Sequence, residues 1–208
     1  MFPVCRKPTL DVKRAQQISD RRPGDREIRP ARSAVGGGEA GGERPILFVD
    51  VDGVISLFGF DPGGPPPGSF HSIDGIPHCI GAEAGGRLAR LADRYELVWA
   101  TGWEEKANEY LPHLLGMPRR LPVLSFEDAV FGTAHWKLAA IDAYAGDRPA
   151  AWIDDSLDER CREWARRRRA PTLLVETESA VGITDDHVDR LLRWADEVAP
   201  EVGAGDRR

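Results

Sequence analysis

The chain has 208 residues, of which 41% are hydrophobic and 30% are charged, and its formal net charge is −6. This length suits one α/β domain with a full core, and the composition is that of an ordinary soluble protein. The negative charge argues against nonspecific DNA binding, because such binding needs a positive surface.

The three cysteines, Cys5, Cys79 and Cys161, are widely spaced and form no CxxC pair. Such sparse use favours a reducing setting, so we expect a cytoplasmic protein. No stretch approaches the roughly 18 apolar residues of a membrane helix. The basic residues near the amino terminus are not followed by the apolar segment of a secretory signal. We therefore expect no membrane partner, and no obligate protein partner is evident.

Residues 1–44 hold ten Lys and Arg against six Asp and Glu, and they show no sustained hydrophobic period. The run GGGEAGGERP at their end has the composition of a flexible linker. We predict a disordered basic tail or linker over 1–44 and a catalytic domain over 45–200. Two alternatives stay open for the tail: it arises from an upstream start codon and has no role, or it contacts nucleic acid.

From Pro45 onward, apolar β-rich runs alternate with helical patterns. Alternation of this kind predicts a parallel sheet with helices on both faces and right-handed crossovers. The expected strands are Ile46–Val49, Glu96–Ala100, Pro122–Phe126, Ala150–Ile153 and Thr172–Val175. The expected helices are Glu83–Arg94, Glu104–Leu115, His135–Ala145, Leu157–Arg168 and Asp185–Val198, the last behind Thr184 as its N-cap.

Residues 56–81 interrupt this alternation, because they are dense in Gly and Pro and have no helical period. A segment of this kind directly after the first strand predicts a hairpin-like flap over the sheet edge. The alternative is a long surface loop with no part in substrate choice.

The first strand carries the most informative motif, ILFVDVDGV over Ile46–Val54. Alternate side chains of a strand share a side, so Asp50 and Asp52 lie on the same side, about 7 Å apart along the chain. Two like charges at the end of a buried strand are costly unless a cation or a reaction needs them. A turn or helix-capping pair is the alternative explanation of these two carboxylates.

Polar residues also follow the second and fourth expected strands, as Thr101-Gly102 and Asp154-Asp155. Lys137 lies near the start of the helix before the fourth strand. Ligands of open α/β sheets bind at the carboxyl ends of the strands, so these residues are expected at one site. Two alternatives remain: Asp154-Asp155-Ser156 could cap a helix at Leu157, and Lys106 could take the place of Lys137.

In this order and spacing, DVDGV, Thr101, Lys137 and the Asp154-Asp155 pair resemble the four motifs of the haloacid dehalogenase (HAD) superfamily over about residues 45–176. WATGWEEKAN, HWKLAAI and RPAAWIDDS are further similar to the HAD domain subgroup associated with RNA-repair proteins. The resemblance implies a three-layer Rossmann-like α/β fold with a five-stranded parallel sheet in the order 5-4-1-2-3. It also implies a cap-poor phosphatase type, because only the flap follows strand one and residues 125–135 are too few for a cap domain.

The resemblance assigns roles to the carboxylates. Asp50 would be the nucleophile that forms an aspartyl-phosphate, and Asp52 the general acid and then base. Mg²⁺ prefers oxygen ligands. They would come from Asp50, the backbone carbonyl of Asp52, Asp154 and Asp155, the last directly or through water.

Thr101 would hydrogen-bond a phosphoryl oxygen, and Lys137 would pair with the nucleophile and the phosphoryl group. Gly53 and Gly102, in the turns after the strands, and Trp103, which could stack on a ring, are the expected substrate-binding residues. The arginine run over 166–169 could bind a phosphate backbone, but a solvated helix end is the simpler interpretation.

The function expected from this resemblance is Mg²⁺-dependent hydrolysis of a phosphomonoester. In this family an open site suits bulky substrates such as nucleic-acid ends or phosphoproteins, and a small phosphomonoester such as a nucleotide is the other substrate if the flap closes. Carbon–halogen hydrolysis needs neither a second acid nor a metal, so Asp52 and Asp154-Asp155 argue against it. The alternative from another class is a noncatalytic phosphate-binding or regulatory domain.

Overall fold

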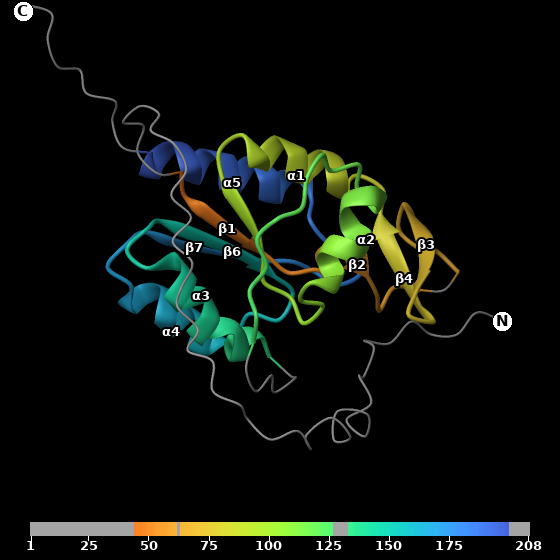
Figure 1. The fold of residues 1–208 in the computed structure, drawn as a ribbon, viewed down its shortest axis with the longest axis horizontal. Helices are drawn as coiled ribbons and strands as arrows, with labels where there is room; N and C mark the ends of the chain where they lie inside the picture. Colours follow the sequence, from red (N-terminus) through yellow and green to blue (C-terminus); the bar gives the residue numbers. More distant parts are fainter. Residues whose placement is uncertain (1–43, 62, 127–132, 200–208) are drawn as a thin grey trace, which may run out of the picture. The chain divides into compact units, whose positions relative to one another are not determined.

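The computed structural model describes residues 44–61, 63–126 and 133–199 (Figure 1). The tail predicted over 1–44 therefore lies, except for Arg44, outside the described residues. Within the part of the chain that is described, no helix is both long and apolar enough to cross a membrane.

The central element is a parallel sheet of four strands in the order β5-β1-β6-β7 (Figure 1). Strand β1 lies between β5 and β6, and Val49 at its end pairs with Trp99 on one side and Ile153 on the other. The carboxyl ends of these three strands therefore meet at one edge. The strands are β1 (Ile46–Val49), β5 (Glu96–Trp99), β6 (Ala150–Asp154) and β7 (Thr172–Glu176).

The strand expected over Pro122–Phe126 is not formed, and only a single parallel bridge joins Val123 to Trp99. The Trp99 N–H donates to the Pro122 carbonyl, and the Leu124 N–H donates to the Trp99 carbonyl. Proline has no N–H with which to continue a ladder, which limits pairing at this edge. The described sheet thus has four strands, and the full order of five stays a prediction.

Helices cover both faces of this sheet because the buried strand side chains alternate between two cores. Leu47 and Val49 belong to one core, and Ile46 and Phe48 belong to the other. The first core takes in helices α1 (Ala84–Ala92), α2 (Lys106–Leu114) and α5 (Asp185–Val198). The second takes in α3 (Leu138–Ala145), the 3₁₀ turn η2 (Ala134–Lys137) before it, and α4 (Glu159–Arg167).

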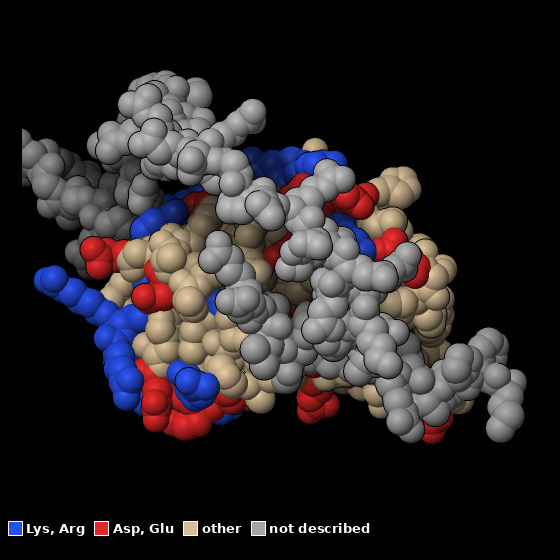
Figure 2. Space-filling model, turned by 60° about the horizontal axis from the view of Figure 1, so that its bottom comes forward, with Lys and Arg blue, Asp and Glu red and all other residues tan. Residues whose placement is uncertain are grey.

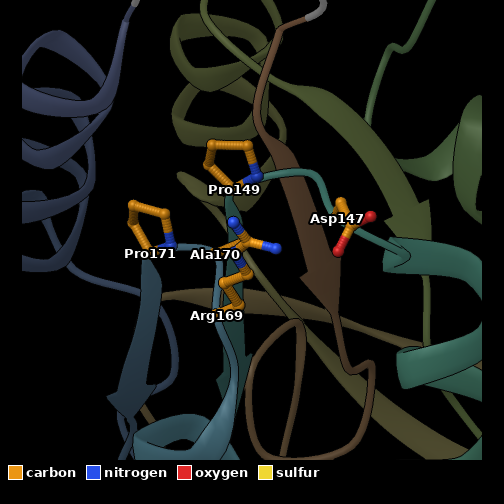
Figure 3. Close-up of a pocket in the computed structure, with 5 residues that line it drawn as sticks. All are labelled: Asp147, Pro149, Arg169, Ala170 and Pro171. Atoms are coloured by element: carbon orange, nitrogen blue, oxygen red, sulfur yellow. The ribbon is translucent and has the colours of Figure 1, made fainter.

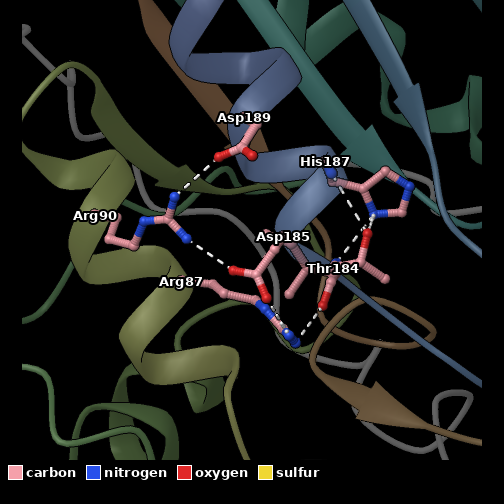
Figure 4. A network of polar contacts seen from close by, with 7 residues as sticks. Arg87, Arg90, Thr184, Asp185, His187 and Asp189 are labelled. Carbon is pink, nitrogen blue, oxygen red and sulfur yellow. Dashed lines mark hydrogen bonds and ion pairs between the residues drawn. The ribbon is translucent and has the colours of Figure 1, made fainter.

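Helices α1 and α5 lie side by side and are joined by an arginine–aspartate network (Figure 4). Arg87 contacts Asp185 at 2.9 Å, and Arg90 contacts Asp185 at 2.7 Å and Asp189 at 2.9 Å. The predicted N-cap of α5 is confirmed, because the Thr184 side chain accepts from the backbone N–H of His187.

The residues expected to form a flap build a second, antiparallel sheet in the order β2-β4-β3. Its strands are β2 (Ser56–Leu57), β3 (Gly68–Ile73) and β4 (Ile76–Gly81). Asp74 and Gly75 join β3 to β4 with φ angles of 52° and 78°, as in a tight hairpin turn. Lys106 of α2 forms an ion pair with Asp74, so this lysine holds the hairpin tip.

Helix α4 begins later than expected, at Glu159, and its N-cap is Asp158, whose side chain accepts from the Cys161 N–H at 3.0 Å. The interpretation of Asp154-Asp155-Ser156 as a cap is therefore wrong. Arginines of α4 pair with neighbouring acids, as in Arg162–Glu176 and Arg166–Glu159. Figure 2 likewise shows basic and acidic side chains next to one another on the visible face.

Candidate active site

Three charged side chains meet at the carboxyl edge of the central sheet. Asp50 directly follows β1 and Asp154 ends β6, both in phase with the strand residues that face α3 and α4. Lys137 reaches them from that layer, because it is the last residue of η2. All three are buried, with exposed fractions of 6%, 0% and 3% respectively. Asp50, Asp154 and Lys137 are thus brought together at one edge of the sheet.

The Lys137 ammonium bridges the two carboxylates, at 2.8 Å from Asp50 Oδ2 and 2.7 Å from Asp154 Oδ2. Burial works to lower the pKa of Lys137, but the two carboxylates outweigh it and the net shift is upward. Burial raises the pKa of Asp50 to about 8, and Asp154 and Asp52 add to the rise while Lys137 opposes it. A further cation beside Asp50 would favour its ionised form.

Asp155 completes an acidic cluster. One carboxylate oxygen from each of Asp50, Asp154 and Asp155 lies within 4.8 Å of the others. The Asp155 carboxylate is held in place, because its Oδ1 accepts from the Ser156 hydroxyl at 2.8 Å and its Oδ2 from the Ser179 hydroxyl at 2.6 Å. Three carboxylates against one ammonium leave excess negative charge, which suits a divalent cation with oxygen ligands.

Gly53 packs directly against this cluster. Its φ is +76°, and a Cβ added there would lie 2.3 Å from Asp155 Oδ2. The Gly53 N–H donates to the Ser56 carbonyl at 2.7 Å within the turn, and its carbonyl accepts from the Thr177 hydroxyl at 2.8 Å. The lack of a side chain at Gly53 thus lets the turn approach Asp155.

Gly53→Ala should lower the free energy of unfolding by roughly 2 kcal/mol or more, through the positive φ and the collision with Asp155. Gly59→Ala is the matched control, because its φ is +77° but nothing lies within 4 Å of the added Cβ. We expect Gly53→Ala, and not Gly59→Ala, to reduce the rise in melting temperature on adding Mg²⁺. Equal responses of the two variants would contradict this role of Gly53.

Asp52 lies outside the three-carboxylate cluster and is turned toward another partner. Its Oδ2 accepts a hydrogen bond from the Trp103 indole N–H at 3.1 Å. Trp103 in turn contacts His78 of β4 edge to face, with ring centroids 4.6 Å apart. His78 Nδ1 and the Ser56 hydroxyl are hydrogen-bonded at 2.9 Å. The sequence offers His78, with His71 and His135, as a pocket-lining candidate against the simpler interpretation of a core or solvated histidine. It gives no signal for Ser56, since no spacing connects Ser56 with Asp52.

Thr101 is fully buried just after β5, and its hydroxyl oxygen accepts from the Trp103 N–H at 3.3 Å. A hydroxyl that accepts in this way keeps its own hydrogen for donation to another group. Gly102 is exposed in the same turn. Lys106, the competitor of Lys137, is not part of the cluster, because it pairs with Asp74 at the flap tip.

A hollow lined by Asp147, Pro149, Arg169, Ala170 and Pro171 lies at the opposite end of the sheet (Figure 3). Pro149 and Pro171 immediately precede β6 and β7, so this hollow is at the amino ends of those strands. It is therefore separate from the cluster around Asp50 and Asp154.

Comparison with known families agrees with this geometry. Residues 46–188 match the family model described as HAD domain in Swiss Army Knife RNA repair proteins. The match covers more than half of the chain and includes β1, Lys137 and β6. No curated protein matches the chain.

Proposed function

We propose that this chain, which belongs to the family of HAD domains in Swiss Army Knife RNA repair proteins, is a Mg²⁺-dependent phosphomonoesterase that acts through Asp50. The observation that carries the proposal is the buried triad in which Lys137 bridges Asp50 and Asp154 beside Asp155. Buried charges of this kind are costly, and a reaction that uses them accounts for that cost.

The residues present suit a magnesium ion. Asp50, Asp154 and Asp155 would hold it, with the Asp52 carbonyl as a further ligand, because hard oxygen donors are those that Mg²⁺ prefers. When bound, the ion would neutralise charge on the phosphoryl oxygens and favour the ionised form of Asp50.

In the first step, a carboxylate oxygen of Asp50 attacks phosphorus, and the bond from phosphorus to the leaving oxygen breaks. Asp52 gives its proton to that oxygen, so the product leaves as an alcohol. Lys137 stabilises the negative charge that builds up near Asp50, and the Thr101 hydroxyl donates to a phosphoryl oxygen.

In the second step, Asp52 takes a proton from water, whose oxygen attacks the phosphorus of the aspartyl-phosphate. The bond between phosphorus and the Asp50 oxygen breaks, inorganic phosphate is released, and the Asp50 carboxylate is restored. Asp52 ends the cycle protonated, ready for the next leaving group.

The family suggests that the substrate is a phosphate at a nucleic-acid end. A nucleotide carries the same phosphomonoester group and is the smaller alternative substrate. The flap sheet β2-β4-β3 follows the Asp50–Gly53 turn directly, and His78 of β4 contacts Trp103. We infer that this flap borders the leaving-group side of the site and so affects which alcohol is accepted.

The test is a phosphatase screen with Mg²⁺ that includes nucleotides and oligonucleotides phosphorylated at the 3′ or the 5′ end. We expect Mg²⁺-dependent release of phosphate, strongest on one type of oligonucleotide end, and loss of release after chelation. No release from any substrate by the folded protein would overturn the proposal in favour of a noncatalytic phosphate-binding domain.

A further inference from the structure

Four side chains form a closed ring next to the candidate nucleophile. From Asp52 the ring passes to Trp103 through the indole N–H, to His78 through the edge-to-face contact, and to Ser56 through a hydrogen bond. It closes through the turn after β1, where residues 52 and 56 form a β-bridge. The ring thus joins the turn after β1 and the start of β2 to strand β4 of the flap and to the turn after β5.

The ring is placed so that it restrains the Asp52 carboxylate. His78 and Ser56 are buried, with exposed fractions of 6% and 3%, so the far side of the ring is fixed by the core of the flap sheet. Burial lowers the pKa of His78, although Asp52 opposes this, and the net shift favours the neutral imidazole. A neutral ring packs against the Trp103 indole without adding a charge beside Asp52.

A hydrogen bond to one carboxylate oxygen restrains the rotation of the carboxyl group and hence the directions open to both oxygens. Proton transfer requires the acid to lie within hydrogen-bond reach of the leaving oxygen, and a misplacement of about 1 Å can cost roughly 100-fold in rate. The rate of proton transfer to the leaving oxygen therefore depends on the orientation of the Asp52 carboxyl group.

We propose that Trp103, braced by His78 of the flap, is a positioning residue that aims Asp52 at the leaving oxygen of the substrate. This inference rests on the proposed phosphomonoesterase activity, and it assigns Trp103 a part in proton transfer that does not depend on stacking with the substrate. Through His78, it also ties the placement of the flap to the placement of the general acid.

The kinetic test uses Trp103→Phe, which keeps an aromatic ring and removes the N–H donor. Protonation of the leaving oxygen matters most for a poor leaving group, so kcat/KM, which reports the first step and not the later hydrolysis that also uses Asp52, should fall about 10-fold or more on an alkyl phosphate, against less than about 3-fold on p-nitrophenyl phosphate. Trp164→Phe is the matched control, since the Trp164 indole also donates to an aspartate, Asp142 at 2.8 Å, but packs against the other core. It should change neither rate.

A double-mutant cycle then asks whether Trp103 acts through Asp52. In an Asp52→Asn background the proton carrier is already lost, so Trp103→Phe should cause no further loss that depends on the leaving group. An equal loss of kcat/KM on both substrates for the Trp103→Phe single variant, or the same selective loss in both backgrounds, would overturn the inference.

A spectroscopic test needs no turnover. In a ¹H–¹⁵N spectrum, Asp52→Asn should shift the indole resonance that is missing from Trp103→Phe, and Asp142→Asn should shift the one missing from Trp164→Phe. An unmoved Trp103 resonance would contradict the hydrogen bond. If Asp52→Asn shifts the Trp103 resonance but wild-type protein releases no phosphate, the proposed function is overturned instead, so the two failures are distinguishable.

Discussion

Asp50→Asn should lower kcat for phosphate release by about 10⁴-fold or more, because an amide oxygen is a poor nucleophile and removing a nucleophile commonly has effects of this size. The fold should survive, since the amide has nearly the same shape and Asp50 is restrained by the Val51 N–H at 2.8 Å. The measurement is steady-state phosphate release at saturating substrate and Mg²⁺, together with the melting temperature.

Asp147→Asn is the control for Asp50→Asn, because Asp147 is exposed and lies at the amino ends of the strands. It should leave kcat unchanged. A rate for Asp50→Asn close to that of wild type would remove Asp50 from the role of nucleophile.

Lys137→Met should damage both stability and activity. The variant keeps the length of the side chain but leaves two buried carboxylates, Asp50 and Asp154, without their shared ammonium. Removing one partner of a buried charge cluster costs roughly 3 kcal/mol. The loss of charge stabilisation at the phosphoryl group should lower kcat by about 100-fold or more.

The stability effect of Lys137→Met is measured by thermal unfolding with and without Mg²⁺. Lys106→Met is the matched control, because Lys106 pairs with the exposed Asp74 and screening by water makes such pairs weak. Added Mg²⁺ should raise the melting temperature of Lys137→Met more than that of wild type, since it supplies the missing positive charge. A melting temperature for Lys137→Met equal to that of Lys106→Met would contradict the structural role of the triad.

The parts of the fold that follow a strong local pattern could be predicted from the sequence. Strand Ile46–Val49 and helix Asp185–Val198 have the predicted bounds, because a fully apolar run and a clear N-cap are local signals. The segment over Pro122–Phe126 has a similar apolar content but lies at a sheet edge, where among the described residues an isolated bridge joins Val123 to Trp99. Hydrophobicity alone does not distinguish an edge bridge from a strand.

The start of α4 shows that a local sequence signal also does not determine which residue caps a helix. Asp154, Ser156 and Asp158 all have side chains that can cap a helix, and the choice among them depends on the tertiary structure. Leu157 packs into the core on the α3 side, which leaves Asp158 in the extended conformation that a cap requires. The hairpin of β3 and β4 was expected only in outline, although its Asp74-Gly75 pair is a typical two-residue turn signal.

The candidate site also has a part that sequence patterns predict and a part that depends on the tertiary structure. The cluster of Asp50, Asp154, Asp155 and Lys137 follows from strand ends that meet at one sheet edge, together with the resemblance to a known family. The contact between Trp103 and Asp52 depends on side-chain direction across two turns, and no residue spacing encodes it. The pairing of Lys106 with the flap tip likewise depends on where the hairpin folds back.

The most direct test of catalysis through Asp50 is to trap the covalent intermediate. The protein is mixed with substrate and Mg²⁺, quenched within one turnover and reduced with borohydride, which converts an aspartyl-phosphate to homoserine. Mass spectrometry of the peptide that contains residues 46–54 should place homoserine at position 50, and none should form without substrate. Steady phosphate release with no homoserine at position 50, or with homoserine at another aspartate, would contradict the mechanism.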